Sequence, residues 1–262
     1  MGQFMEWTFV VDPCGRIHWI LVRSPMQQTV FISGTDHGLG ASLAATWADR
    51  GALVFAGVLR FPSSPVELRA QGGEIRRIVL DLSSDAQVAQ ALAAVRQSVD
   101  HFDVVVNNGA ILGDITKTAF DPLDFDEMLR VYNVNVLGTL RLTQALLPLL
   151  LAGPQKLIVN ISSEAGSIGS CHRQNWYAYA MAKAALNMQS ALIHNLIHDQ
   201  GGRVLVLHPG HVRTFMQGAE DVDAVLTADE AARLVLANVD RSGSIAGERP
   251  LFLDPQGETL PW

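Results

Sequence analysis

Cysteine is scarce in this sequence, and lysine is nearly as rare. The two cysteines among the 262 residues, Cys14 and Cys171, are far apart and lack the spacing of metal ligands. So few cysteines suit a protein that is kept reduced in the cytoplasm, which is the location we expect. The three lysines are Lys117, Lys156 and Lys183. Because lysine is rare, a lysine at a mechanistically useful position carries more weight.

An excess of basic charge and long hydrophobic runs are also missing. The formal net charge is −7, and an acidic chain has no broad attraction for phosphate backbones, so we expect no nucleic-acid partner. The longest apolar run starts at Ala145, is short and contains Pro148, so we expect no segment that spans a membrane. The N-terminus carries Glu6 where a secretory signal would have a basic cluster.

Length and composition suit one large domain with an appendage. With 262 residues, 48% of them hydrophobic, the chain can bury a sizeable core. Residues 1–25 are interpreted as an N-terminal appendage with a small hairpin around Asp12–Gly15. Met26 begins a stretch that is typical of a domain start, so the main domain is predicted to span residues 26–262.

Apolar runs alternate with helical stretches along this domain. The runs are continuous in valine, isoleucine and leucine, which indicates a parallel sheet covered on both faces. The fold class is therefore α/β, a single doubly wound domain, in which ligands bind beyond the carboxyl ends of the strands. Strands are predicted at 29–33, 52–58, 75–82, 102–108, 156–163, 203–210 and 250–254, and helices at 38–51, 64–73, 84–99, 124–151, 177–198 and 228–239.

A glycine-rich turn follows the first predicted strand of this domain. Gly34, Gly38 and Gly40 open the next helix, and such a turn leaves backbone N–H groups free for a pyrophosphate. The alternative is an ordinary turn between a strand and a helix. The position after the first strand of a βαβ unit favours a dinucleotide site.

The stretch "WYAYAMAKAALN" holds two tyrosines and a lysine at the start of a predicted helix. Tyr179 and Lys183 are four residues apart and therefore lie on the same helix face, one turn from each other. Tyr177 is six residues from Lys183 and is interpreted as a packing residue. A tyrosine and a lysine at this spacing also occur by chance in many helices, so the pair needs support from other motifs.

Polar side chains at other strand ends allow two interpretations each. Asn107, after the fourth predicted strand of the domain, could simply close the strand end. Ser162 and Ser163, after the fifth, could be turn residues alone. Asn135 stands inside an otherwise apolar helix, where its amide is either a satisfied core group or part of a water relay.

Seven motifs in order resemble the short-chain dehydrogenase/reductase family. They are "SGTDHGLG", "VLDLS", "VVNNGA", "NVNVLGT", "IVNISS", "YAMAK" and "HPGHVRT", spread over residues 28–262. The ending "GETLPW" and the stretch "SIGSCHRQNWYAYAMAKAALN" are similar to the sniffer-like or C-factor-like carbonyl reductase branch. The resemblance implies a Rossmann fold and an oxidoreductase that uses a nicotinamide cofactor.

The family's catalytic set falls on Asn135, Ser163, Tyr179 and Lys183. The resemblance implies that Tyr179 is the general acid for reduction or the base for oxidation. Ser163 would hold the substrate carbonyl oxygen, Lys183 would bind the nicotinamide ribose, and Asn135 would position a water that relays protons to Lys183. The gap from Ser163 to Tyr179 is longer than usual in the family, and we interpret the extra residues as a loop rim beside the substrate.

The resemblance also assigns the cofactor site. An acid at the end of the second strand of the domain would bind the adenine ribose and repel a 2′-phosphate, but this sequence has Arg60 there. NADP is therefore favoured, and NAD stays the alternative. "NNGA" reverses the usual last two letters, which puts Gly109 in doubt as a binding residue. The implied cofactor-binding residues are Gly34, His37, Gly38, Leu39, Gly40, Arg60, Asp81, Leu82, Asn107, Tyr179, Lys183, Pro209, Gly210, Val212 and Thr214.

The leading hypothesis is an NADPH-dependent reductase of a ketone or aldehyde on a small to medium organic substrate. One alternative is a dinucleotide-binding sensor or signalling protein that keeps the fold without turnover. Another is an NAD-linked alcohol dehydrogenase. The resemblance further implies a homodimer or homotetramer formed through the two long helices. The segment after Thr214 is short, so we expect a small lid and an open site; Trp176 and Met216 are expected to line the pocket.

Overall fold

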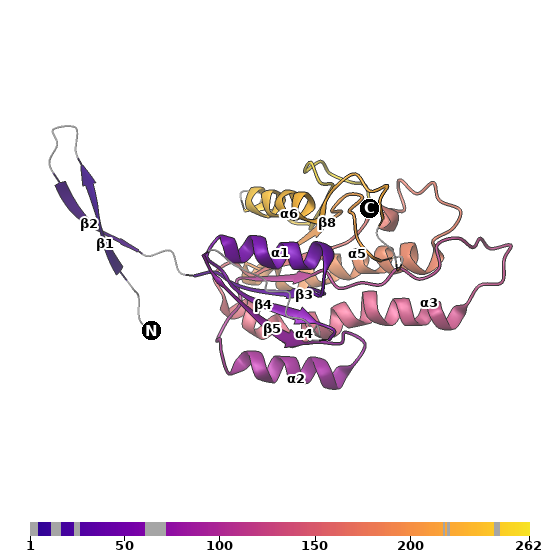
Figure 1. The fold of residues 1–262 in the computed structure, drawn as a ribbon, viewed down its shortest axis with the longest axis horizontal. Helices are drawn as coiled ribbons and strands as arrows, with labels where there is room; N and C mark the ends of the chain where they lie inside the picture. Colours follow the sequence, from indigo (N-terminus) through magenta and orange to yellow (C-terminus); the bar gives the residue numbers. More distant parts are fainter. Residues whose placement is uncertain are drawn as a thin grey trace.

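The computed structural model describes the backbone of 5–11 and 17–23, and residues 27–60, 72–216, 218, 221–243 and 247–262 in full. A seven-stranded parallel sheet forms its centre (Figure 1). The strand order is β5-β4-β3-β6-β7-β8-β9, so the sheet is built outward in both directions from β3. The strands are β3 (Thr29–Ser33), β4 (Leu53–Val58), β5 (Glu74–Val79), β6 (Val104–Asn107), β7 (Leu157–Ile161), β8 (Arg203–Leu207) and β9 (Leu251–Leu253).

Helices cover both faces of this sheet. On one face lie α1 (Gly38–Asp49) and α6 (Ala228–Ser242), whose apolar side chains share a core cluster with the strands. The other face carries α2 (Asp85–Arg96), α4 (Thr139–Ala152) and α5 (Tyr177–Ile197), which share a second cluster. Because every central strand is buried on both faces, its residues read as a continuous apolar run. The predicted doubly wound α/β fold is confirmed.

Capping side chains set where several helices begin. The Ser84 hydroxyl accepts a hydrogen bond from the Gln87 backbone at the start of α2. Thr227 and Glu230 form a reciprocal capping box at the start of α6. The predicted helix at 64–73 falls largely on residues outside the described part of the chain.

The predicted helix at 124–151 is continuous but not uniform. It consists of α3 (Phe125–Tyr132), a π-helical turn (Asn133–Gly138) and α4. Within the described residues, Phe125–Ala152 is the one stretch long and apolar enough to cross a membrane by length and composition. In its most apolar window, 44% of the residues are buried, and Leu142, Leu146 and Leu150 pack in the core. Core packing therefore accounts for part of its apolar character.

The N-terminal segment contributes a separate sheet. Strands β1 (Met5–Val11) and β2 (Ile17–Arg23) pair with each other in antiparallel register, from Met5 opposite Arg23 to Val11 opposite Ile17. They take no place in the seven-stranded sheet. The turn predicted around residues 12–15 lies outside the described part.

Candidate active site

One large cavity of about 1310 Å³ opens at the carboxyl ends of the strands. Its wall is made by the segments that follow β3, β4, β5, β6, β7 and β8, together with the end of α3, the π-helical turn and the start of α5. Strand β3 pairs with β4 on one side and β6 on the other, so the chain changes direction of winding here. Doubly wound sheets bind ligands at this switch point. The volume is ample for a dinucleotide and a small substrate together.

The glycine turn after β3 has the close packing that a pyrophosphate site needs. A Cβ atom on Gly40 would overlap the Gly34 carbonyl oxygen, and one on Gly34 would overlap the Gly109 backbone. Gly34 and Gly38 also have positive φ values of 68° and 57°, which favour glycine. No side chain caps the start of α1, so its first N–H groups stay available to an anion. These residues fit the diphosphate of a nicotinamide dinucleotide.

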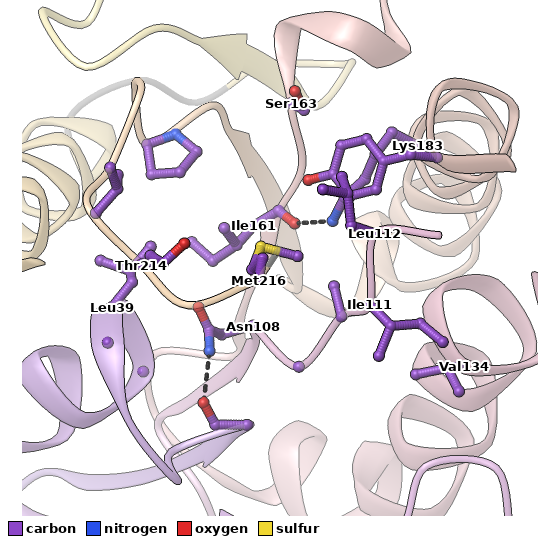
Figure 2. A pocket seen from close by; sticks show the side chains of 18 of the residues that line it. Leu39, Asn108, Ile111, Leu112, Val134, Ile161, Ser163, Lys183, Thr214 and Met216 are labelled. Carbon is purple, nitrogen blue, oxygen red and sulfur yellow. Dashed lines mark hydrogen bonds between the residues drawn. The ribbon is translucent and has the colours of Figure 1, made fainter. Parts of the chain in front are cut away.

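The reversed "NNGA" motif keeps this turn in place. The Ser33 hydroxyl accepts hydrogen bonds from the backbone N–H groups of Asn108 and Gly109, both at 3.1 Å. The Asn108 amide also donates to the Gly34 carbonyl at 2.9 Å, as Figure 2 shows. Gly109 lines the cavity and packs directly on Gly34. A glycine here lets the two backbones approach, which explains how the altered motif is accommodated.

Asn107 lies behind the cavity wall. Its amide nitrogen donates to the Thr143 hydroxyl on α4 at 3.0 Å and to the Asn160 side chain on β7 at 2.8 Å. Alternate residues of a strand point to opposite faces. The next residue, Asn108, therefore lines the cavity instead. Asn107 itself does not line this cavity, and its predicted part in cofactor binding stays a prediction.

Tyr179, Lys183 and Ser163 meet on the cavity wall. The Lys183 ammonium lies 5.3 Å from the centre of the Tyr179 ring and donates to the Ile161 carbonyl at 2.8 Å. Figure 2 shows Lys183 reaching from its helix to Ile161, with Ser163 in the segment that follows the end of β7. Tyr177, two residues before Tyr179, is not part of this wall. The one-turn spacing thus brings the phenol and the amine to one place.

Burial dominates the electrostatics of this group. It raises the pKa of the Tyr179 phenol above its ordinary range, and the Glu164 carboxylate raises it further, while a hydrogen bond with Ser163 acts in the opposite direction. Burial also lowers the pKa of Lys183 to about 8. At neutral pH the phenol is therefore protonated, which suits a proton donor.

Asn135 sits in the π-helical turn, close to this group in the fold. Its side-chain oxygen accepts from the Ile111 N–H at 2.9 Å, and its nitrogen donates to the Ile111 carbonyl at 2.8 Å. Ile111 lines the cavity, whereas Asn135 itself does not. Both amide atoms are satisfied, so the structure supports the first of its two interpretations. Its part in a proton relay stays a prediction. Single π turns often occur at functional sites.

The part of the cavity at the end of β4 is polar. Asp36 accepts the backbone N–H groups of Leu59 (2.9 Å) and Arg60 (3.4 Å) at the end of β4. The Asp36 carboxylate thereby fixes the backbone of the segment that carries Arg60. The His37 ring meets the Phe215 ring edge-on, with 6.3 Å between ring centres. The segment after β8 therefore touches the glycine turn.

This segment after β8 forms the small lid expected from the sequence. A bridge between Val212 and Leu226 closes its base, and an ion pair of 2.7 Å joins His211 to Asp221. Its described residues form turns and no helix. Phe215 in this segment is exposed by 54%.

Most residues predicted from the sequence line this cavity. Asn135 and Asn107 are the exceptions. Trp176 and Met216 line it as expected. Lining residues that sequence reasoning did not assign include Asp36, Leu59, Asn108, Ile111, Leu112, Asn133, Val134, Glu164, Arg173, His208, His211 and Asp221.

Three of these unassigned residues are ionisable and lie beside the catalytic group. Arg173 binds Glu164 through two contacts of 2.6 and 2.7 Å. His208 is partly buried, and burial is the main cause that lowers its pKa. The longer gap between Ser163 and Tyr179 was the sequence signal for this region, but a partner for Glu164 cannot be identified from spacing alone.

A family model described as short chain dehydrogenase matches residues 28–224. The chain belongs to the short-chain dehydrogenase family. This dehydrogenase is 35% identical over 160 residues to the C-signal of Myxococcus xanthus, covering 61% of this chain and 92% of that one. It is 33% identical over 224 residues to the short-chain dehydrogenase srdF of Neurospora crassa, covering 79% and 87%. It is therefore an oxidoreductase of this family.

Solved structures agree with this assignment. An NADPH-bound carbonyl reductase from chicken fatty liver is 26% identical and has a TM-score of 0.74, covering 90% of this chain and 99% of that one. The carbonyl reductase Sniffer of D. melanogaster, at 21% identity, has the same fold, with a TM-score of 0.77 and coverage of 90% and 100%.

Proposed function

We propose that this dehydrogenase reduces a ketone or aldehyde on a small to medium organic substrate, with NADPH as the hydride donor. The observation that carries the proposal is the placement of Tyr179, Lys183 and Ser163 on one cavity wall beside the glycine turn. The similarity to an NADPH-bound carbonyl reductase supports it.

Each residue of this group has a defined task in the proposed reaction. When bound beside this group, NADPH would supply the hydride that the carbonyl carbon accepts. The Ser163 hydroxyl orients the carbonyl oxygen, and the Tyr179 phenol donates its proton to that oxygen as negative charge develops. The Lys183 ammonium, held by the Ile161 carbonyl, stabilises the phenolate that remains. The glycine turn and the start of α1 bind the diphosphate.

The protonation state of Tyr179 favours reduction over oxidation at neutral pH. Burial and the Glu164 charge raise the pKa of the phenol, so the free protein holds the proton that reduction consumes. Alcohol oxidation would need the phenolate instead. The free protein therefore starts in the protonation state that reduction needs.

A carbonyl panel tests the proposal. Purified full-length protein is mixed with NADPH and benzaldehyde, acetophenone, or aliphatic aldehydes and ketones, and the loss of absorbance at about 340 nm is followed. We expect turnover of at least one compound, at a rate that depends on enzyme concentration. A folded protein that binds NADPH and turns over none of them would contradict the proposal.

The choice of NADPH is supported by charge at the end of β4. Arg60 lines the cavity there and is exposed, so its guanidinium can reach a 2′-phosphate. Asp36 is the nearby acid, and its oxygens already accept two backbone N–H groups. Those contacts partly compensate its charge, which reduces its repulsion of a phosphate.

Replacing Arg60 with glutamine is expected to weaken NADPH binding about tenfold and to leave NADH binding within about twofold. The loss corresponds to one partly solvated charge-assisted contact, about 1.4 kcal/mol. Fluorescence titration of both cofactors measures it. Arg50→Gln is the matched control, because Arg50 pairs with Asp240 outside the cavity. Equal loss for NADPH and NADH, or no loss for either, would contradict the NADPH preference.

Similarity to the C-signal of Myxococcus xanthus supports a second candidate, a dinucleotide-binding signalling protein without turnover. A third is an NAD-linked alcohol dehydrogenase. Cofactor binding without hydride transfer would favour the signalling protein. Tighter binding of NAD than NADP, with alcohol oxidation, would favour the alcohol dehydrogenase.

We also propose that the protein forms a homodimer or homotetramer in the cytoplasm. The outer side of α5 exposes Met181, Met188, Leu192 and Leu196, each by 57–63%, and Phe125 and Leu129 on α3 are similarly exposed. Such a contiguous apolar helix face supports self-association. Sedimentation of the full chain tests this, and a single species of 28.4 kDa would contradict it. The free, exposed thiol of Cys171 supports a reducing location.

A further inference from the structure

An ion pair borders the catalytic group without belonging to it. Glu164 directly follows Ser163, and Arg173 lies in the loop that precedes α5, called the rim loop here (residues 167–175). The guanidinium binds both carboxylate oxygens, Nη1 to Oε2 at 2.6 Å and Nη2 to Oε1 at 2.7 Å. Both side chains are largely shielded from solvent, with exposed fractions of 21% and 33%. Such a paired, shielded contact is stronger than an exposed ion pair.

The Arg173 guanidinium also reaches Tyr179 indirectly, through the ring of Trp176. Arg173 stacks on Trp176, 4.9 Å from the centre of the nearest ring. The Trp176 ring meets the Tyr179 ring edge-on at 6.0 Å and 74°. Trp176 has a positive φ of 68°, a strained conformation for a bulky residue, so surrounding contacts must hold it. The Arg173 stack is one of those contacts.

The rim loop is anchored to the fold on its other side. The backbone N–H of Ser170 donates to the Ser167 hydroxyl at 3.2 Å, and the Gly169 N–H donates to the carbonyl of the C-terminal Trp262 at 2.9 Å. A Cβ atom on Gly169 would lie 3.1 Å from Pro261. These contacts fix the position of the rim loop and therefore that of Arg173.

The carboxylate of Glu164 acts electrostatically on Tyr179. Its negative charge raises the pKa of the phenol, in the same direction as burial. A guanidinium bound to both of its oxygens opposes that effect at short range. The elements packed around Tyr179 carry these charged or titratable side chains: Lys183 on α5, Glu164 after β7, Arg173 in the rim loop, His208 after β8, and Asp114 in the segment of Leu112 and Ile115.

We propose that Arg173 is a positioning residue of this dehydrogenase, which masks the Glu164 charge beside Ser163 and Tyr179 and, through Trp176, holds the Tyr179 ring in place. This inference rests on the proposed function, because it concerns the proton transfer of that reaction. A purely structural ion pair would tie the rim loop to the core and leave the proton transfer unchanged.

The pH dependence of alcohol oxidation tests the proposal. The substrate is the alcohol formed from the most active carbonyl compound of the panel, starting with benzyl alcohol, with NADP⁺ as oxidant. Oxidation needs the phenolate, and in the complex with NADP⁺ the positive nicotinamide would lower the pKa of the Tyr179 phenol into the accessible pH range. With saturating NADP⁺, kcat/KM for the alcohol therefore rises with pH up to the phenol pKa of that complex. Arg173→Gln unmasks Glu164 and is expected to move this rise to higher pH by about one unit. Glu164→Gln leaves Arg173 positive and is expected to move it to lower pH.

The double variant Glu164→Gln/Arg173→Gln removes both charges, and its pH rise is expected within about 0.3 unit of the wild-type position. Arg173→Lys keeps the charge but loses the two-point contact, so it should lower kcat while leaving the pH rise in place. Arg50→Gln, which breaks the exposed pair with Asp240, is the matched control and should change neither.

Equal losses of kcat in both single variants, with no opposite shifts in pH, would overturn the proposal and leave the proposed function standing. Opposite shifts of the pH rise in the two single variants, and a return to the wild-type position in the double variant, would support the proposal. If the wild-type protein turned over neither the alcohols nor the carbonyl panel, the proposed function itself would fail.

Discussion

Tyr179→Phe is expected to lower kcat/KM for carbonyl reduction by about a thousandfold and to leave the Kd of NADPH within about twofold. A positioned proton donor contributes about 10² to 10⁴ in rate, and phenylalanine removes only the hydroxyl. The ring that packs on Trp176 stays in place. The variant should therefore fold and bind cofactor normally while the oxygen of the substrate receives no proton from this position.

Tyr177→Phe is the matched control for this variant. Tyr177 loses the same hydroxyl on the same helix, but it lies outside the cavity wall. Its kcat/KM should stay within about twofold of the wild-type value. Steady-state kinetics and NADPH fluorescence titration measure both variants. If Tyr179→Phe kept full activity, or if both variants lost it equally, Tyr179 would not be the proton donor.

Lys183→Met is expected to abolish turnover and, at the same time, to stabilise the free protein by about 1–2 kcal/mol at pH 7. The ammonium of Lys183 is buried, and burial lowers its pKa to about 8 from the ordinary value of 10.5. That difference corresponds to about 3 kcal/mol of unfavourable charge burial. Loss of the hydrogen bond to the Ile161 carbonyl offsets part of the gain.

The stability gain should depend on pH in a defined direction. Between pH 8 and 10.5, Lys183 is protonated in the unfolded chain but increasingly deprotonated in the folded one. The free energy of unfolding of the wild-type protein therefore rises with pH over this range. The destabilisation caused by burying the Lys183 charge is fully present below pH 8 and absent above pH 10.5. The advantage of Lys183→Met should therefore be largest near pH 7 and shrink toward pH 10.

Urea unfolding at pH 7 and pH 10 measures this difference. Lys156→Met is the matched control, because Lys156 also donates to a backbone carbonyl, that of Gln200 at 3.0 Å, but does so outside the cavity. Its free energy of unfolding should change little and show no such dependence on pH. A Lys183→Met variant that was less stable than wild type at pH 7 would contradict the account of its buried charge.

The elements of the fold could be predicted because their patterns are local. The centres of the runs, such as residues 30–32 and 204–207, are continuously apolar, which is typical of a buried parallel strand, and the glycine turn after Ser33 marks the switch point. Strand ends were predicted a few residues too long, as at 75–82 against β5, because apolar character continues into the cavity wall.

The electrostatic surroundings of the site could not be predicted in the same way. The pairing of Tyr179 with Lys183 follows from helix geometry, but the pairing of Glu164 with Arg173 depends on the path of the rim loop. Asn107 and Asn108 are adjacent, and only the strand's register decides which one faces the cavity. The π turn at Asn135 likewise has no counterpart in the helical pattern.

The most direct test of the central claim is isotope transfer. NADPH carrying deuterium at both C4 positions is incubated with the protein and the most active carbonyl compound, and the alcohol product is analysed by mass spectrometry. The account predicts one deuterium on the carbinol carbon of the wild-type product, formed about a thousandfold more slowly by Tyr179→Phe. An alcohol without deuterium, or no alcohol from a protein saturated with NADPH, would contradict it.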